Sequence, residues 1–326
     1  MRIALTGSIA TDHLMTFGGR FADSFVEGQL EHVSLSFLVD DLEVRRGGVA
    51  ANIAFGMAVL GGAPVLVGAV GQDFTDYRSW LERHGVDCRS VLVSEVDSTA
   101  RFVCTTDSEL AQIASFYPGA MRQARDIELG PVMDRLGGLD LVVVSPNDPE
   151  AMLRHSQECR ARSVPFVADP SQQLAFLDGE SIRRLVDGAA YLFSNDYEAA
   201  LIQSKTGWSE SDIAQRVGTR VVTHGKDGAT VTARSQAPVH VAVVAPDRVA
   251  DPTGVGDAFR AGFLTALSWG LEPGLCAQLG SVVAAYVLET VGTQEYVLDR
   301  AGVLARLGQT YGERSSAQVA EHLSIG

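Results

Sequence analysis

The amino-acid sequence predicts a three-layer α/β/α fold with a central, mostly parallel sheet and a small β-sheet lid, and three observations support this. Short apolar runs of the kind that forms fully buried strands alternate with helical segments along the chain. Two other segments alternate apolar and polar residues, which indicates strands with one exposed face. With 326 residues, of which 46% are apolar and 20% charged, the chain can bury a large core without a disulfide or a metal.

The buried strands are continuous apolar or β-branched runs, and we predict them at residues 3–5, 65–70, 141–144, 166–168, 191–193 and 221–223. A helix is predicted over residues 49–60, where a Gly-Gly pair ends it. Asp148 and Pro149 suit the N-cap and first position of another helix, which should reach about Arg162. From Asp299 the chain again shows a helical pattern.

The two alternating segments are residues 33–37 and 102–106, and the second continues through a turn at 107–109 into residues 113–117. We expect them to form a small antiparallel sheet that projects from a single domain spanning residues 1–326. The sheet would be built from two excursions of the chain, at about 13–46 and 98–118. It would cover a binding site as a lid or pair with another subunit. An edge extension with no role in binding is the alternative.

The chain is acidic, with 40 Asp and Glu against 26 Lys and Arg and a formal net charge of −14. Proteins that wrap nucleic acid need a positive face, so we expect no nucleic-acid partner. A polyanionic ligand would instead be held by backbone amides, helix N-termini or Mg²⁺. No run approaches the roughly 18 apolar residues of a membrane span, and no signal peptide is evident. The four cysteines lack zinc-binding spacing and are expected as reduced thiols, so we expect a cytoplasmic protein without membrane contact.

The strongest motif is the segment 251–264, where a loop of Gly254, Val255 and Gly256 followed by Asp257 opens a small-residue helix. Glycines let backbone amides approach a ligand closely, and a helix N-terminus favours an anion there. A carboxylate repels phosphate, so Asp257 at this point suits the removal of a proton from a hydroxyl group. A plain helix-capping carboxylate is the alternative. The Walker motif is absent, and the dinucleotide motif fails because a phenylalanine stands at its third glycine.

A second motif lies about 200 residues earlier, where Gly47 and Gly48 precede a helical segment that contains Asn52. The glycines permit close backbone approach to a ligand, and the Asn52 amide offers a donor and an acceptor to a diol. The two motifs, in this order, resemble the signatures of the ribokinase/PfkB carbohydrate kinase family. The resemblance implies a ribokinase-like fold and transfer of the γ-phosphoryl group of ATP. Val255 departs from it, because the family usually has Ala or Ser there.

Three other segments carry weaker parts of the resemblance. Asp12 matches the family's residue for the acceptor hydroxyls, although alone it reads as an ordinary loop residue. Asn195 and Glu198 match the N-x-x-E motif that helps to place Mg²⁺ and phosphate, and an N-cap with a solvated Glu is the alternative. The turn 223–228 matches a nucleotide-contacting turn, and alone it reads as a hairpin. The resemblance thus assigns a water-mediated metal contact to Glu198 and ATP contacts to Asn195, Thr223, His224, Gly225, Lys226, Asp227, Gly228 and Gly256.

Nearly the whole chain looks closest to the adenosine kinases of actinobacteria. That resemblance implies stacking of Phe102 and Phe116 on a purine and contacts of Gln172 and Gln173 with the edge of the base. Two phenylalanines in the core of the lid are the alternative. Ser36 would reach a ribose from the lid, in this chain or in a partner subunit. The ribose itself would be held by Ser8, Asp12, Gly48 and Asn52.

Together these residues imply an ATP:adenosine 5′-phosphotransferase of purine salvage, with Asp257 as the base and the amides of residues 254–256 stabilising the transferred group. Mg²⁺ would arrive with ATP, and K⁺ would act as an activator. We expect a homodimer joined through the lids. Ribose, a ketohexose, inosine or guanosine as the acceptor remains an alternative, as does a non-catalytic nucleoside- or sugar-binding regulator. An NAD-dependent oxidoreductase is disfavoured by the missing dinucleotide motif.

Overall fold

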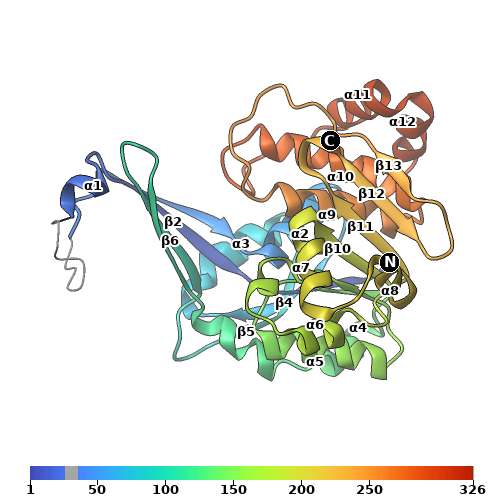
Figure 1. Ribbon diagram of the computed structural model, residues 1–326, viewed down its shortest axis with the longest axis horizontal. Helices are drawn as coiled ribbons and strands as arrows, with labels where there is room; N and C mark the ends of the chain where they lie inside the picture. Colours follow the sequence, from blue (N-terminus) through green and yellow to red (C-terminus); the bar gives the residue numbers. More distant parts are fainter. Residues whose placement is uncertain (26–35, 326) are drawn as a thin grey trace.

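The computed structural model describes residues 1–25 and 36–325, and its body is a nine-stranded sheet with helices on both faces (Figure 1). Across this sheet the strands are β13 (Val239–Val241), β12 (Ala229–Ala233), β11 (Thr219–Thr223), β10 (Tyr191–Asn195), β9 (Phe166–Ala168), β8 (Leu141–Val144), β1 (Ile3–Thr6), β4 (Val65–Val70) and β5 (Asp87–Val93). All neighbours from β11 to β5 are parallel, whereas β12 and β13 are antiparallel. The predicted three-layer fold is therefore confirmed.

Two hydrophobic cores lie on opposite faces of the sheet. On one face the helices are α2 (Val49–Val59), α3 (Thr75–Arg83), α9 (Val255–Ser268), α10 (Pro273–Leu288), α11 (Arg300–Tyr311) and α12 (Glu313–Ala320). On the other they are α4 (Leu129–Leu136), α5 (Pro149–Ala161), α6 (Gly179–Val186), α7 (Asp196–Thr206) and α8 (Glu210–Arg216). Because both faces are covered, β1, β4, β8 and β9 are buried throughout and appear in the sequence as unbroken apolar runs.

Local signals set the helix ends as predicted. The Asp148 carboxylate accepts hydrogen bonds from the amides of Glu150 and Ala151, and Pro149 occupies the first position of α5. Asp299 caps α11 in the same way, by accepting from the amide of Gly302. The four cysteines are buried and unpaired, and within the described part of the chain no helix combines the length and apolar character needed to cross a membrane.

A separate four-stranded sheet, here called the lid, projects from one side of the body (Figure 1). Its strands, in order, are β3 (Asp41–Gly47), β2 (Ala10–Thr16), β6 (Ala100–Thr106) and β7 (Gln112–Tyr117), and the short helix α1 (Phe21–Ser24) follows β2. The strand predicted at residues 33–37 is wrong where it can be judged, because residues 36 and 37 form no strand and 33–35 lie outside the described residues. The antiparallel arrangement is confirmed for β6 with β7 and for β2 with β3, whereas β2 pairs with β6 in parallel.

The sequence analysis predicts neither β2 nor β3, because both strands have weak hydrophobic patterns. β2 and β3 pair along seven consecutive residues through backbone hydrogen bonds. Nearly all of β2 is only partly buried and most of β3 is exposed, so neither face demands apolar side chains. A search for alternating apolar residues therefore misses both strands.

Glycines allow α9 and α10 to pack closely. A Cβ atom added to Gly262 would lie 2.8 Å from the Cα of Gly280 and 2.8 Å from the carbonyl oxygen of Leu279. These are backbone atoms that cannot rotate away from an added methyl group. Since α9 begins at the predicted anion loop, the close packing of its middle also fixes where that loop lies.

We expect Gly262→Ala to lower the free energy of unfolding by about 1–3 kcal/mol, because the methyl group forces the two backbones apart. The matched control is Gly308→Ala in α11, where the nearest atom to an added Cβ is a Glu313 carboxylate oxygen at 3.3 Å. That substitution should be neutral or stabilise by up to about 1 kcal/mol. Urea titration of both variants measures the difference, and equal stabilities would show that the helix crossing tolerates a side chain.

Candidate active site

A cavity of about 740 Å³ lies between the lid and the loops that follow the carboxyl ends of the body strands. In parallel α/β sheets these loops are where ligands bind. All the predicted acceptor-binding residues except Ser36 line this cavity, namely Ser8, Asp12, Gly48, Asn52, Phe102, Phe116, Gln172, Gln173 and Asp257. We call it the acceptor cavity.

The register of the lid aligns three of these side chains. Asp12 on β2 lies opposite Phe102 on β6, and Phe102 lies opposite Phe116 on β7. Side chains of directly paired residues share one face of a sheet, so a carboxylate and two aromatic rings form a row across the lid. Phe116 remains 49% exposed, which leaves a ring available to a flat ligand.

Ser36 does not reach this cavity in its own chain. It is exposed and stands next to Phe37, whose ring packs against Phe17 and Phe21 at ring-centroid distances of 5.0 Å. Phe17 follows the last residue of β2, about 16 Å along the strand from Asp12 at about 3.3 Å per residue. Ser36 therefore lies at the outer end of the lid.

Asp257 is held by a network of neutral side chains. Its Oδ2 accepts a hydrogen bond of 2.9 Å from Nδ2 of Asn52. Oδ1 of Asn52 in turn accepts from Oγ1 of Thr293 and from Nε2 of Gln294, at 3.0 and 2.9 Å. These two donors fix the orientation of the Asn52 amide, and thereby point its Nδ2 at the carboxylate.

The alternative that Asp257 caps the helix is not realised. Gly254 is the N-cap of α9, with φ of +76° and no side-chain capping bond, and Asp257 is the third helical residue. The left-handed backbone at Gly254 favours glycine, and an added Cβ would lie 2.7 Å from the Thr293 side chain. The Asp257 carboxylate therefore does not cap the helix, and it lines the acceptor cavity.

Burial sets the protonation of the two cavity carboxylates. It raises the pKa of Asp257 to about 7, and the positive charge of Arg260 and the Asn52 hydrogen bond oppose the rise. Burial also raises the pKa of Asp12 to about 6, against the charge of Arg45. A carboxylate whose pKa lies near neutrality is suited to accept a proton.

A second cavity of about 640 Å³ lies on the other side of the anion loop, and we call it the nucleotide cavity. Val255 and Gly256 face it, whereas Gly254 and Asp257 face the acceptor cavity. The loop 254–257 is therefore the wall between the two. Of the predicted ATP contacts, the nucleotide cavity is lined by Asn195, Thr223, Gly225, Lys226, Gly228 and Gly256.

His224 and Asp227 are not among the residues that line this cavity. The His224 ring is engaged on both nitrogens, by Asp196 at 2.7 Å and by Thr230 at 2.8 Å. The turn itself joins β11 to the antiparallel β12, so the hairpin reading of residues 223–228 is also realised. Apolar side chains that sequence reasoning did not single out form the rest of the wall, among them Val243, Val249, Phe259, Ala285 and Leu288.

Asn195 and Glu198 form a reciprocal capping box at the start of α7. Asn195 accepts from the Glu198 amide, and Oε2 of Glu198 accepts from the Asn195 amide, both at 2.8 Å. Oε1 of Glu198 has only a long contact of 3.3 Å with the Ser171 hydroxyl. Since only Oε1 of Glu198 remains available, this pair is better suited to contact a hydrated ion through water than to coordinate the ion directly.

The described residues include no cluster of three His, Cys, Asp or Glu side chains that could hold a metal by themselves. This fits Mg²⁺, which usually keeps several waters and binds through substrate phosphates with one or two carboxylates. Glu198 would then hold the ion through water.

Sequence reasoning missed several residues of the acceptor cavity. Met121, Arg122 and Phe176 line it from segments that carry no recognisable motif. It also gave no role to Asp169 and Arg260, which form a buried ion pair with a distance of 2.6 Å beneath the site. Arg260 could have been identified as a neighbour of Asp257, because it follows three residues later on the same side of the helix.

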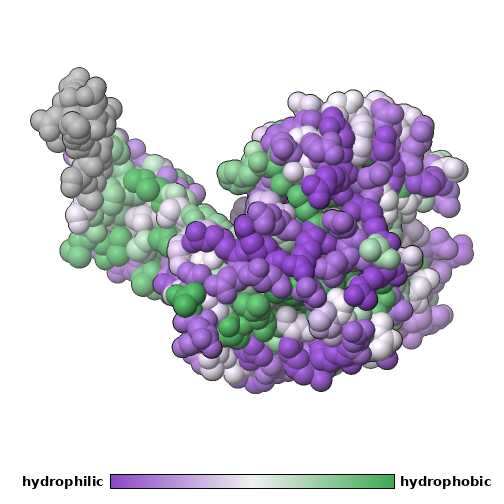
Figure 2. All heavy atoms as spheres, turned by 90° about the horizontal axis from the view of Figure 1, so that it is seen from below, coloured by the Kyte–Doolittle hydropathy of each residue, from purple (hydrophilic) through white to green (hydrophobic). Residues whose placement is uncertain are grey.

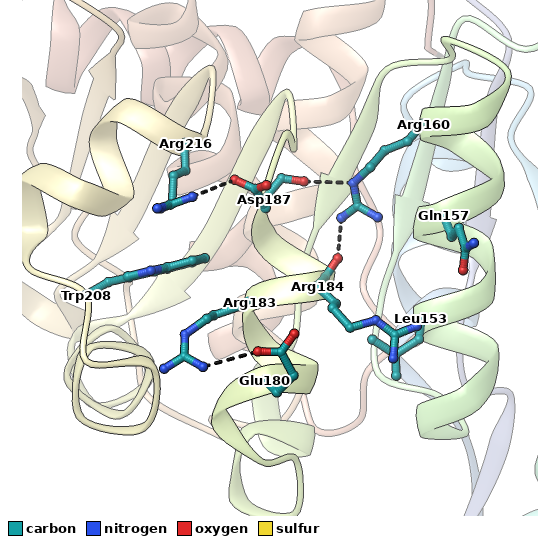
Figure 3. A pocket seen from close by; sticks show the side chains of 9 residues that line it. All are labelled: Leu153, Gln157, Arg160, Glu180, Arg183, Arg184, Asp187, Trp208 and Arg216. Atoms are coloured by element: carbon teal, nitrogen blue, oxygen red, sulfur yellow. Dashed lines mark hydrogen bonds and ion pairs between the residues drawn. The ribbon is translucent and has the colours of Figure 1, made fainter.

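A third depression, lined by four arginines, has a structural explanation (Figure 3). Nε of Arg160 donates to the carbonyl oxygen of Asp187, and Nε of Arg183 donates to that of Thr206, so both satisfy the ends of helices. Arg216 lies over the Trp208 ring and 3.2 Å from the Asp187 carboxylate. These arginines connect α5, α6, α7 and α8 to one another, and we assign them no ligand.

Comparison with known proteins identifies the family. The model of the pfkB family carbohydrate kinases matches residues 11–300. The nucleoside kinase of Methanothermobacter thermautotrophicus is 32% identical over 269 residues, which is 82% of this chain and 85% of that protein. The structure of Burkholderia thailandensis nucleoside kinase in complex with inosine matches with a TM-score of 0.83 and 36% identity, covering 95% of this chain and 98% of that one. The chain belongs to the pfkB family of carbohydrate kinases.

Proposed function

We propose that the protein is an adenosine kinase, which transfers the γ-phosphoryl group of ATP to the 5′-hydroxyl of adenosine and yields AMP. The observation that carries the proposal is the loop 254–257, which separates a cavity with aromatic and amide groups from a nucleotide cavity. Relatives named nucleoside kinases support a nucleoside as the acceptor, and one of the solved structures holds ADP and inosine.

Transfer would proceed in line across the loop. The 5′-hydroxyl lies beside Asp257, which accepts its proton, while Asn52 keeps the carboxylate turned toward the acceptor cavity. The amides of Gly254, Val255 and Gly256, at the positive end of α9, stabilise charge on the transferred oxygens. Mg²⁺, when bound with ATP, would neutralise charge on its phosphates. Closure of the lid would exclude water and so limit hydrolysis of ATP.

Polar groups in the acceptor cavity suit the edge of a purine base such as adenine. Nε2 of Gln173 donates to the carbonyl oxygen of Asn147 at 2.8 Å, which leaves its Oε1 as an acceptor. Oε1 of Gln172 accepts from the Ser171 hydroxyl at 2.9 Å, which leaves its Nε2 as a donor. One acceptor and one donor suit the amino group and a ring nitrogen of adenine.

Inosine is the second candidate, because the matched Burkholderia thailandensis structures hold it and its base also offers a donor and an acceptor. An ADP-release assay with adenosine, inosine, guanosine, ribose and fructose separates the candidates. We expect adenosine to give the highest kcat/KM and to form AMP. A higher value for inosine would keep the nucleoside kinase and replace its substrate. Reaction with free sugars alone would remove the roles given to the aromatic and glutamine residues, and no turnover with any acceptor would support the non-catalytic regulator.

We expect Asp257→Asn to lower turnover by about 10²–10⁴-fold while the affinity for adenosine stays near that of the wild type. In the wild type kcat/KM should fall about tenfold per pH unit below about pH 7 and level off above it, because only the ionised carboxylate accepts a proton. Initial rates from pH 5 to 9 test both statements. Unchanged turnover in the variant would remove Asp257 as the base.

We expect Phe102→Ala to lower kcat/KM for adenosine by about 5–150-fold, since a stacked aromatic contact contributes about 1–3 kcal/mol. Any activity with ribose should hardly change, because ribose has no ring to stack. The matched control is Phe37→Ala, which removes an aromatic ring from the lid without touching the acceptor cavity. Equal losses with both acceptors would mean that Phe102 acts through the lid core.

We also propose a homodimer joined through the lids, with Ser36 reaching the partner's ribose. On the face opposite to Asp12, Leu42, Met15, Thr105 and Ile113 are paired in a row, and Leu42 and Ile113 are 54% and 47% exposed. Figure 2 shows hydrophobic residues gathered over the lid. Sedimentation should give a dimer that Leu42→Lys dissociates and that Val96→Lys, an 86% exposed control, leaves intact. A monomeric wild type would contradict the proposal.

For K⁺ as an activator, the family resemblance is the only support. Rates measured in K⁺ and Na⁺ buffers of equal ionic strength test it. We expect faster turnover in K⁺, and equal rates would remove the ion from the proposal.

A further inference from the structure

A second charged side chain is buried directly behind the proposed base. Arg260 lies one helical turn after Asp257 on α9, is only 8% exposed, and donates through Nη2 to Oδ1 of Asp169 at 2.6 Å. Asp169 follows the end of β9 and is fully buried. Residues three apart face the same side of a helix, so the negative, positive and negative charges of Asp169, Arg260 and Asp257 lie in succession.

This arrangement contributes little to the stability of the folded protein. Nε of Arg260 and Oδ2 of Asp169 are buried without a hydrogen-bond partner in the described part of the chain. A buried ion pair whose remaining polar atoms are unsatisfied does not recover the free energy lost by removing both charges from water. Burial alone lowers the pKa of Arg260, but the charges of Asp169 and Asp257 raise it above the usual value, so the guanidinium stays charged.

The guanidinium also lies against the anion loop. A Cβ atom added to Gly256 would lie 2.9 Å from Nη1 of Arg260. Gly256 has ordinary helical geometry, so its lack of a side chain is explained by this close approach rather than by its backbone conformation. A fixed positive charge thus lies against the backbone of a loop residue that faces the nucleotide cavity.

We propose that Arg260, held by Asp169, is a positioning residue whose charge favours the carboxylate form of Asp257 at neutral pH. The inference rests on the proposed function only in naming Asp257 as the base. The charge acts through space on a group that burial would otherwise protonate.

Four titratable groups on different elements surround Asp257. The directions in which they shift the pKa of Asp257 allow the proposal to be tested. Arg260 lowers the pKa of Asp257, whereas the charges of Asp169 and Asp12 raise it. Tyr296 is buried, and burial together with the Asp257 charge raises its pKa, so it stays neutral. Of the three charged neighbours, Arg260 has the largest effect.

The decisive experiment measures the pH at which kcat/KM falls on the acid side of its pH profile, here called the acidic limb. It compares variants that should shift this limb in opposite directions. Asp169→Asn removes a negative charge but keeps an acceptor for Arg260, so the limb should move to lower pH by about 0.5–1 unit. The double variant Asp169→Asn with Arg260→Gln replaces the ion pair by a neutral pair, and the limb should move to higher pH by about 1 unit or more. Arg260→Lys keeps the charge and should leave the limb near its wild-type position.

A merely structural pair would change the melting temperature of these variants and leave the limb in place, and that result would overturn the proposal. Shifts of the same sign in the first two variants would overturn it as well. If the double variant does not fold, Arg260→Gln alone takes its place with the same readouts, because it removes the charge that is proposed to act on Asp257. Titration of the Asp257 carboxyl by ¹³C NMR, with Asp257→Asn to assign the resonance, measures the same shifts without turnover. The two proposals can therefore fail separately. Unchanged activity in Asp257→Asn would show that Asp257 is not the base, whereas unshifted NMR titrations would show that Arg260 does not control its ionisation.

Discussion

The partial burial of the Asp257 carboxylate next to the open N-terminus of α9 is the constraint on which the rest of the site depends. A carboxylate that is partly removed from water needs polar partners, and the Asn52 amide, itself fixed by Thr293 and Gln294, meets this requirement. Gly254 begins the same helix without a capping side chain, which suits the proposed binding of an anion at this helix start. The close packing of α9 on α10 then holds both features in one place.

The lid and the anion loop are connected through the same residues. Oγ1 of Thr293 is hydrogen-bonded both to the carbonyl oxygen of Arg46, at the end of β3, and to Asn52. Arg45, next to it on β3, lies 3.5 Å from Asp251, which precedes the loop. Hydrogen bonds thus connect β3 to Asn52 through Thr293, and Asn52 to Asp257. We infer that the proposed closure of the lid and the orientation of the proposed base are coupled through these bonds.

Sequence reasoning succeeded where a single physical demand dominates a segment. Strands buried on both faces, such as β4 and β8, must be apolar throughout, and the Asp148 N-cap follows from local hydrogen bonding. Motifs placed Asn52 and Asp257 in one cavity although 205 residues separate them. β2 and β3 could not be predicted, because strands that are only partly buried or exposed carry little hydrophobic signal. Asp169 and Arg260 were missed since their pairing joins distant segments, and no local pattern records it.

The acidic character of the chain gives Arg260 its importance. With a net charge of −14, the protein offers an anionic substrate little general attraction, and Asp12, Asp169 and Asp257 add negative charge at the site itself. Backbone amides can stabilise phosphoryl oxygens, but they are neutral dipoles and cannot offset three carboxylates. A lysine reaching in from the surface would move with solvent, whereas a guanidinium fixed by Asp169 keeps its position through the reaction. We therefore infer that a buried arginine behind the loop favours the ionised form of one carboxylate beside a bound phosphate.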